Sequence, residues 1–337
     1  MKLNDRIKTI TEWGGRIASL PSSEKDTLFQ KAYNKNGWFT PSGSENAING
    51  ILPWLQAEVL QNWLSHYSLP DGFSKKTVGL VMAGNIPLVG FHDFLSVLLS
   101  GHMAKIKLSS QDDALLPYLT SLLTSIDNRW ENRFSFEDRL NHVDAVIATG
   151  SDNSARYFEY YFRNIPKIIR KNRTSVGIVM GEETSNEFQK LGRDVFSYFG
   201  LGCRNVSKVF VPDDFDLGNL MGAFQEHQDV INHHKYANNY DYQKAIRLIS
   251  GKKFLDGDFL IMEKSSGLVS PIAVLYYEHY ANVDHLYESI AGLNDKLQCI
   301  VSAKRWFKGS IAFGEAQTPH VDDYADNIDT MKFLESF

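Results

Sequence analysis

The feature that most constrains the fold of this chain is a change in the spacing of its apolar residues near Thr77. Before it, from residue 1 to about 70, apolar residues recur at helical intervals, and the stretch GWFTPSGSENA interrupts them. After it, short β-rich runs alternate with helical ones: TVGLVM, PLVGFHDFLSVLLSG, AKIKL, DDALLPYLTSLL and VDAVIAT. This βαβαβ order predicts a mostly parallel sheet with helices on both faces, because parallel strands need crossover connections.

A second group of alternating elements follows a change of domain that we expect near residues 170–175. It comprises a helix over TSNEFQKLGRDVFSYF, strands over SKVFVP, DFLIME and IAVLYY, a helix over DHLYESIAGL and a strand over QCIVSA. With 337 residues, 43% of them apolar, the chain can bury two cores. The sequence therefore predicts two α/β domains, over residues 1–172 with a helical N-terminal segment and over 173–315, and a C-terminal tail over 316–337.

Charge and cysteine content exclude several classes of function. A net charge of -5, a pI near 6.1 and the lack of a dense Lys/Arg run argue against a nucleic-acid partner. The N-terminus, MKLNDRIKTITEWGGRIASL, lacks the apolar stretch of a signal peptide or membrane span, so we expect a cytoplasmic protein. Two cysteines cannot form a disulfide framework and supply only half of a four-cysteine metal site, so each thiol is considered separately.

Cys203 lies in the segment GLGC, where we expect a long amphipathic helix to end at Gly200 and Gly202, just before an apolar strand. Glycines let a backbone approach a ligand closely, and amides near a cysteine can donate to an oxyanion on a carbonyl bound to its sulfur. Arg204 would favour the thiolate. For a lone cysteine the competing interpretation is a small buried hydrophobic residue. GLGCRN is no dinucleotide fingerprint, because it ends in Asn205 and follows a helix.

Three further segments end predicted strands with polar residues: VGLVMAGNIPL at 78–88, AKIKLSS at 104–110 and VIATGSDNSARYF at 146–158. Taken singly, they are explained by turn chemistry, a solvated lysine and a helix cap. In this order together with GLGC, each at the end of a predicted element where open α/β folds bind ligands, they resemble the aldehyde dehydrogenase superfamily over about residues 77–303. That resemblance implies the aldehyde-dehydrogenase-like fold, with a Rossmann-like cofactor domain and a catalytic domain that carries a cysteine nucleophile.

The resemblance implies catalytic roles for two residues. Cys203 matches the nucleophile, and Asn85 matches the asparagine whose side chain donates to the oxyanion. Gly84 stands where the family has a tryptophan.

Four other residues are implied to bind the cofactor. Lys107 matches the lysine that holds the adenosine ribose, and Ser110 replaces the acid beside it. Gly150 and Ser151 match a turn beneath the pyrophosphate, where a helix N-terminus presents amides to anions. Because a hydroxyl at position 110 would not repel a 2′-phosphate as a carboxylate would, we expect NADPH.

Two departures from the family pattern indicate a reductive, acylating enzyme. The glutamate that activates water in aldehyde-oxidising members corresponds to Arg170 or a neighbour in RKNRTSVGIVM. The segment that holds the nicotinamide ribose corresponds to SGLVSP at 266–271, which contains no acid. The chain looks most like the LuxC-type acyl-CoA reductases, which implies NADPH-dependent reduction of a long-chain acyl thioester, bound to CoA or a carrier protein, to an aldehyde through acyl-Cys203. Without a base, that acyl-enzyme would hydrolyse slowly.

Alternatives remain open at this point. Acyl-Cys203 would also serve an acyltransferase or thioesterase that transfers no hydride, and the fold could be a non-catalytic scaffold. His227, His233 and His234 near Asp229 invite a metal site, but a polar helix face explains them better, so we expect no metal. Cys299, inside LQCIVSA, is interpreted as a core residue. A homo-oligomer is left open, and the segments NHHKYANNYDY and FGEAQTPHVDDYADNIDTMKFL receive no role.

Overall fold

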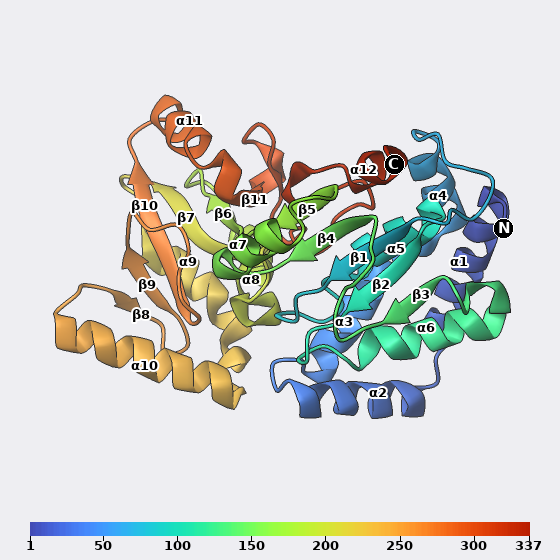
Figure 1. The fold of residues 1–337 in the computed structure, drawn as a ribbon. Helices are drawn as coiled ribbons and strands as arrows, with labels where there is room; N and C mark the ends of the chain where they lie inside the picture. The colour runs from blue at the N-terminus through green and yellow to red at the C-terminus, as the bar shows by residue number, and fades with distance from the viewer. The chain divides into compact units, whose positions relative to one another are not determined.

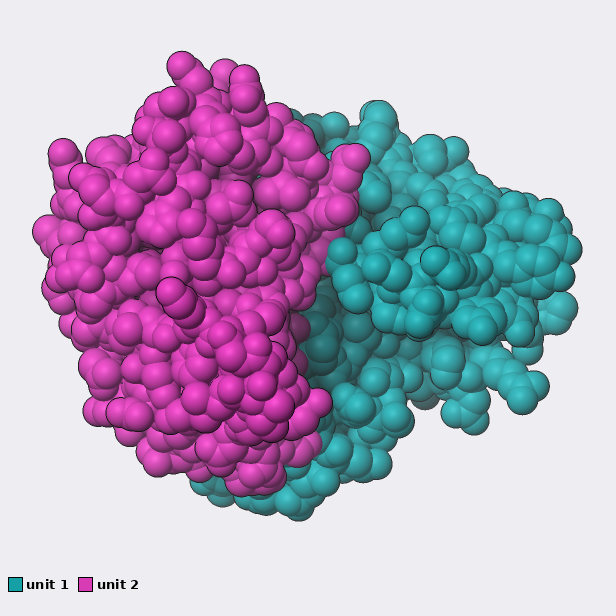
Figure 2. All heavy atoms as spheres, turned by 90° about the vertical axis from the view of Figure 1, so that its left-hand side faces the viewer, with its two compact units in different colours: residues 1–172, 320–337 teal, residues 173–319 magenta.

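Five parallel strands form the sheet of unit 1, one of two units into which the computed structural model of residues 1–337 divides (Figures 1 and 2). Unit 1 consists of Met1–Asn172 and His320–Phe337. Its strands are β1 (Thr77–Val81), β2 (Met103–Lys107), β3 (Phe134–Phe136), β4 (Ala145–Thr149) and β5 (Lys167–Arg170), in the order β3-β2-β1-β4-β5. Its crossover helices are α5 (Phe91–Ser100), α6 (Leu115–Ile126) and α7 (Asp152–Tyr161). The predicted βαβαβ core is therefore confirmed.

Four helices precede this sheet: α1 (Leu3–Ala18), α2 (Ser22–Lys35), α3 (Pro41–Ile51) and α4 (Ala57–Leu64). The apolar stripe of α1 is buried, and Trp13 Nε1 on it donates to the Leu119 carbonyl of α6 at 2.7 Å. The expected interruption over GWFTPSGSENA is wrong in its second half, because α3 begins inside it. Thr40 caps that helix by accepting from the Gly43 amide at 3.1 Å, and Pro41 fits the first helical position.

Unit 2, Arg173–Pro319, contains a seven-stranded sheet in which only the β8–β9 pair is antiparallel. Its strands are β6 (Thr174–Ile178), β7 (Val206–Pro212), β8 (Leu255–Asp256), β9 (Ile261–Lys264), β10 (Val274–Tyr280), β11 (Leu297–Ser302) and β12 (Ile311–Ala312), in the order β12-β11-β6-β7-β10-β9-β8. Its helices are α8 (Ser185–Phe196), α9 (Leu217–Phe224), α10 (His234–Ser250) and α11 (Val283–Ala291). The expected helices and strands of this half are confirmed, except that the first helix, α8, ends earlier than expected.

The last eighteen residues of the chain pack within unit 1. They end in α12 (Thr330–Glu335), and the ring of His102 bonds through Nε2 to the Leu334 carbonyl at 2.9 Å. Nearby, Tyr67 donates to the Asp329 carboxylate at 3.0 Å. No helix of the chain combines the length and apolar character needed to cross a membrane.

Candidate functional site

The carboxyl ends of the unit 1 strands gather five of the six predicted site residues at one edge of the sheet. All these strands are parallel, and their order reverses at β1, which pairs with β2 on one side and β4 on the other. In open α/β sheets ligands bind at such a reversal, outside the carboxyl ends of the strands. Asn85 follows β1, Lys107 ends β2, and Gly150 with Ser151 follows β4.

The loop that carries Asn85 has a backbone held by close packing. A Cβ on Gly84 would lie 2.5 Å from the Ser109 hydroxyl oxygen, so the tryptophan of the family motif would not fit here. Three residues beyond Asn85, Leu88 has a positive φ of 57° and donates its amide to Asp112 at 2.9 Å. Burial raises the pKa of Asp112 to about 6. Asn85 itself is exposed on this loop.

Lys107 and Ser110 lie beside that loop. Lys107 pairs with Val81 in the sheet, and its carbonyl accepts the Met82 amide at 3.0 Å, so β2 and β1 leave the sheet together. The Lys107 and Ser110 side chains are both exposed. An exposed ammonium and an exposed hydroxyl suit the phosphate and ribose groups of a nucleotide.

Gly150 and Ser151 form the entry to α7. Ser151 caps the helix by accepting the Ser154 amide at 3.2 Å, as predicted for a helix N-terminus. A Cβ on Gly150 would lie 2.9 Å from both Ser154 and Phe158, so the glycine permits tight packing of the first turn. The helix directs its amides to the same edge as Lys107, which suits a pyrophosphate, whereas the carboxylate of Asp152 in the first turn opposes an anion. Together, the amides of α7, the Lys107 ammonium and the Ser110 hydroxyl outweigh this one carboxylate and fit the phosphate and ribose groups of a dinucleotide.

Arg170, at the end of β5, forms hydrogen bonds with other residues of unit 1. Its guanidinium bonds to Asp93 at 2.8 Å, to the Thr330 hydroxyl at 2.8 Å and to the Ala325 carbonyl at 2.5 Å. Only 4% of the side chain is exposed. Arg170 therefore binds the C-terminal segment to the sheet edge, and an arginine cannot act as a general base in this state.

Cys203, in unit 2, follows a helix end that differs from the expected one. α8 ends at Phe196, not at Gly200 and Gly202. The chain then passes through three consecutive left-handed residues, with φ of 50° at Tyr198, 58° at Phe199 and 79° at Gly200. The spacing of apolar residues gave no sign of this left-handed segment. Tyr198 and Phe199 continue the apolar pattern of the helix, although their backbone is no longer helical.

A tight turn holds Cys203. The Asn205 amide donates to the Gly202 carbonyl at 3.0 Å, and the Gly202 amide donates to the Asn205 side-chain oxygen at 2.8 Å. The Asn205 side-chain amide donates to the carbonyls of Asp194 at 3.0 Å and Ser197 at 2.7 Å. Asn205 is thus buried and bonded at both ends of its amide. In the sequence, Asn205 served only to show that GLGCRN is not a dinucleotide-binding fingerprint. An asparagine after a glycine-containing segment is nevertheless a recognisable signal of a turn.

Ser175 joins the Cys203 turn to β11. Its hydroxyl donates to the Cys203 carbonyl at 3.1 Å, lies 3.0 Å from the Cys299 sulfur, and accepts the Cys299 amide at 3.2 Å. The starts of β6, β7 and β11 meet here, so Cys203 lies at the amino edge of its sheet rather than at the carboxyl edge, where open α/β folds bind ligands. Cys203 is half-buried.

The second thiol has a different environment. Cys299 lies in β11 and packs against the hydrophobic core of unit 2. Burial raises the pKa of the Cys299 thiol to about 11, with a smaller opposing effect from Arg204. Because the thiolate is the nucleophile, this raised pKa disfavours Cys299 as a nucleophile near neutral pH.

The histidines considered as metal ligands make packing contacts instead. His227 stacks on Phe196 with ring centroids 5.3 Å apart and bonds through Nε2 to the Gln189 carbonyl at 2.9 Å. His233 lies against Phe199 at 4.4 Å. No group of three His, Cys, Asp or Glu side chains in the chain is arranged to hold a metal ion.

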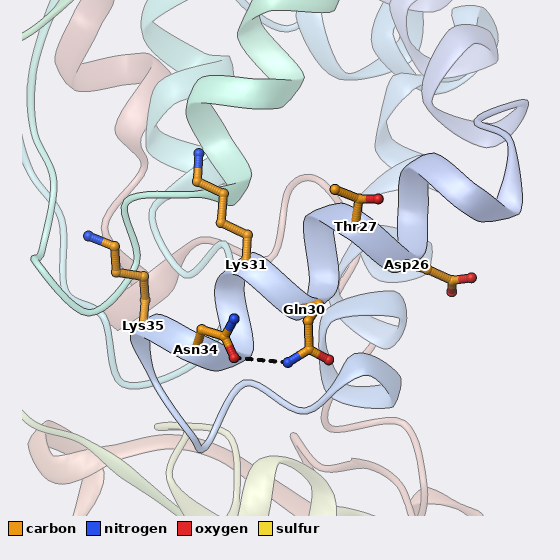
Figure 3. Close-up of a pocket in the computed structure, with 6 residues that line it drawn as sticks. All are labelled: Asp26, Thr27, Gln30, Lys31, Asn34 and Lys35. Carbon is orange, nitrogen blue, oxygen red and sulfur yellow. Dashed lines mark hydrogen bonds between the residues drawn. The ribbon is translucent and has the colours of Figure 1, made fainter.

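A surface depression of about 730 Å³ lies along α2 (Figure 3). It is lined by Asp26, Thr27, Gln30, Lys31, Asn34 and Lys35, all from this one helix. Within it Gln30 donates to Asn34 at 2.9 Å, and Lys35 pairs with Asp113 at 3.1 Å. None of the predicted site residues lines it.

Solved structures with the same fold are aldehyde dehydrogenases. The chain is similar to the NAD+ complex of aldehyde dehydrogenase from Bacillus cereus, with 13% identity, a TM-score of 0.66, and coverage of 91% of this chain and 73% of that one. It is also similar to aldehyde dehydrogenase 21 from Physcomitrella patens in complex with the reaction product succinate, with 13% identity, a TM-score of 0.63, and coverage of 98% and 87%. An NAD-dependent aldehyde dehydrogenase from Sinorhizobium meliloti gives 13% identity, a TM-score of 0.68, and coverage of 90% and 70%.

No protein-family model and no curated protein matches the sequence. The likeness to the solved structures nevertheless confirms the predicted aldehyde-dehydrogenase-like fold, with its two α/β halves.

Proposed function

We propose that this chain reduces an acyl thioester, such as a long-chain acyl-CoA, to an aldehyde through an acyl group carried on Cys203, with NADPH as the reductant. The observation that carries the proposal is the Cys203 turn. A half-buried thiol lies on a backbone fixed by Asn205 and Ser175, in the fold that aldehyde dehydrogenases use. A backbone fixed in this way keeps the nucleophile in one orientation, which favours attack on a bound carbonyl.

In the proposed first step, the Cys203 thiolate attacks the carbonyl carbon of the acyl thioester and forms a carbon–sulfur bond. The Asn85 side-chain amide and a backbone amide of the turn donate to the resulting oxyanion. The oxyanion then collapses, the bond to the CoA sulfur breaks, and CoA leaves as a thiolate. A thiolate is a good leaving group near neutral pH, so this step needs no strong general acid.

In the second step, the carbonyl carbon of the acyl-enzyme is reduced. A reduced nicotinamide, when bound, supplies the hydride. Asn85 again donates to the developing oxyanion, and collapse of the thiohemiacetal oxyanion breaks the carbon–sulfur bond, returns the Cys203 thiolate and releases the aldehyde. Lys107 and Ser110 would bind the adenosine end of the cofactor, and Gly150 with Ser151 would receive its pyrophosphate.

The lifetime of the acyl-enzyme depends on the exclusion of activated water. The segment RKNRTSVGIVM contains no acid, and the guanidinium of Arg170 is bonded to Asp93 and Thr330. A carboxylate base at this position would hydrolyse the thioester before reduction. Its replacement by a structurally engaged arginine supports reduction rather than oxidation as the direction of the reaction.

The test is a turnover assay with a series of acyl-CoAs from octanoyl to stearoyl, the same acyl groups on a carrier protein, and NADPH or NADH. We expect oxidation of NADPH with formation of an equal amount of aldehyde. Cys203→Ala should abolish both, and Cys299→Ala should retain both. Release of CoA without oxidation of either cofactor would overturn the proposal in favour of a thioesterase or acyltransferase.

A further inference from the structure

Helix α10 lies along the lower edge of unit 2 in Figure 1, next to β8 and β9. Its inner face is well anchored. Tyr236, Tyr240 and Arg247 are buried, and Arg247 pairs with Glu263 of β9 at 2.5 Å. Lys244 pairs with Asp256 of β8 at 2.6 Å. These contacts fix which face of the helix points to solvent.

The outer face of α10 is apolar over its second half. Tyr242, Ala245, Ile246 and Ile249 recur at i, i+3, i+4 and i+7, which places them on one side of a helix, and Leu248 lies beside them. Tyr242 is 62% exposed, Leu248 64% and Ile249 88%. A contiguous apolar surface of this kind marks an interaction site, because a helix facing water normally presents polar residues there.

The charges around this stripe are arranged in a way that suits a second copy of the chain. Asp241 lies at the N-terminal end of the stripe and is exposed. Lys252 and Lys253 follow its C-terminal end, beyond Gly251 in a left-handed conformation with φ 66°. Two copies packed antiparallel about an axis near Ala245 would bring Asp241 of each copy towards Lys253 of the other, whereas Lys252 pairs with Glu263 of its own chain.

The same register matches the shapes of the apolar side chains. It places Tyr242 of one copy opposite Ile249 of the other, and the small side chain of Ala245 at the crossing point lets the two helices approach closely. An anionic membrane is a poorer partner, since membrane-binding helices carry clusters of about four to eight basic residues. Here Lys244 and Lys252 already pair with Asp256 and Glu263.

We propose that the outer face of α10, defined as Asp241, Tyr242, Ala245, Ile246, Leu248 and Ile249, binds antiparallel to the same face of a second copy of this chain. A contact made mainly by one helix from each copy is at the small end of protein interfaces. The dimer therefore forms with a dissociation constant in the micromolar range, on the order of 1 to 100 μM.

Sedimentation velocity of the full chain over this concentration range tests the proposal. The wild type should pass from monomer to dimer, and Ile249→Glu should weaken the dimer at least about tenfold, because it buries an unpaired charge in the contact. Val269→Glu is the matched control: Val269 is 65% exposed, lies in the connection between β9 and β10 rather than on α10, and should leave the dimer unchanged. At protein concentrations well below the dissociation constant, where both proteins are monomeric, the thermal midpoint of Ile249→Glu should equal that of wild type, because the residue is 88% exposed.

A charge exchange tests the antiparallel register. Asp241→Lys should weaken the dimer, and the addition of Lys253→Asp should restore it. A wild type that stays monomeric, a dimer that Ile249→Glu leaves intact, or a failure of the double variant to restore the dimer would overturn the proposal. So would a monomeric wild type that co-sediments with phosphatidylserine vesicles through the same face, since the partner would then be a membrane.

Discussion

Asn205 links the turn that carries Cys203 to the end of α8 through a buried side-chain amide. Asn205→Ala removes the acceptor of the Gly202 amide and the donor to the Ser197 carbonyl. Leaving such buried groups unsatisfied costs about 1–3 kcal/mol, so the free energy of unfolding in urea should fall by that amount and acylation of Cys203 should slow. Asn232→Ala, at an exposed asparagine, is the control and should change neither. Unchanged stability of Asn205→Ala would show that the turn does not depend on this amide.

Asn85 is the residue whose loss should affect the reaction without affecting the fold, because its side chain is exposed. A preorganised oxyanion donor is typically worth about 2.7–4 kcal/mol, so Asn85→Ala should lower kcat about a hundred- to a thousandfold. Steady-state kinetics with acyl-CoA and NADPH measures this, and circular dichroism checks the fold. A loss smaller than about tenfold would remove Asn85 from the mechanism.

Sequence reasoning could place the predicted site residues within their local elements but could not supply the contacts that hold them. Asn85, Lys107 and Ser151 lie at strand or helix ends because strong apolar runs precede them, and such runs are legible in a sequence. Gly84 and Ser109 lie close together on two separate loops. Which loops meet in the fold cannot be read from a single sequence. The role of Ser175 was missed for the same reason, because its hydroxyl contacts Cys203 and Cys299 far along the chain. Asn205 was missed although an asparagine after a glycine-containing turn is a recognisable signal.

At the scale of elements, long periodic segments were predictable and short ones were not. β1, β4 and β7 are buried on both faces along most of their length, as strands of parallel sheets are, whereas β2 alternates between buried and more exposed residues. β3 and β12 lie at sheet edges with only three and two residues, so their pairing depends on neighbours rather than on their own composition. The break after α8 depends on backbone angles at Tyr198 and Phe199 that side-chain periodicity does not reveal.

The last residue of β5 couples that strand to the C-terminal segment. Arg170→Ala would leave the Asp93 carboxylate without its partner and free the chain near Ala325 and Thr330. Breaking a buried ion pair costs about 3–5 kcal/mol, so urea unfolding should show a loss of this size. Limited proteolysis should also cleave the C-terminal segment faster than in wild type.

The control for this variant is Arg129→Ala, which breaks an ion pair with Asp127 at an arginine that is 53% exposed. Exposed pairs contribute about 0–1 kcal/mol, so this variant should stay close to wild type. If both variants lost the same stability, burial of the Arg170 pair would not explain its effect.

At the scale of the whole molecule, the free energy of unfolding should decrease as the pH rises from about 4 to about 7. The residue responsible is Asp194, which lies fully buried on α8. Burial raises its pKa to about 7, although the amides of Gly314 and Ala316 donate to it at 2.7 and 3.0 Å. In the unfolded chain this carboxyl ionises near pH 4, so across that window the folded state holds a proton that the unfolded state has lost. Its contribution to stability is therefore lost as the pH rises.

Urea unfolding at about pH 5 and about pH 7.5 measures this effect. Asp194→Asn should be less stable than wild type at both values, because an amide cannot accept from both backbone donors, and its stability should change less between them. Asp113→Asn, at a partly exposed carboxylate paired with Lys35, should keep the wild-type dependence. An unaltered pH dependence in Asp194→Asn would contradict the assignment.

The proposed reaction depends on Cys203 acting as the acyl carrier. Mass spectrometry of the protein after incubation with acyl-CoA, first without and then with NADPH, tests this most directly. We expect one acyl group per chain on the peptide that contains Cys203, stable until NADPH is added and then lost as an equal amount of aldehyde. No adduct, an adduct on Cys299, or an acyl group that NADPH does not remove would contradict it.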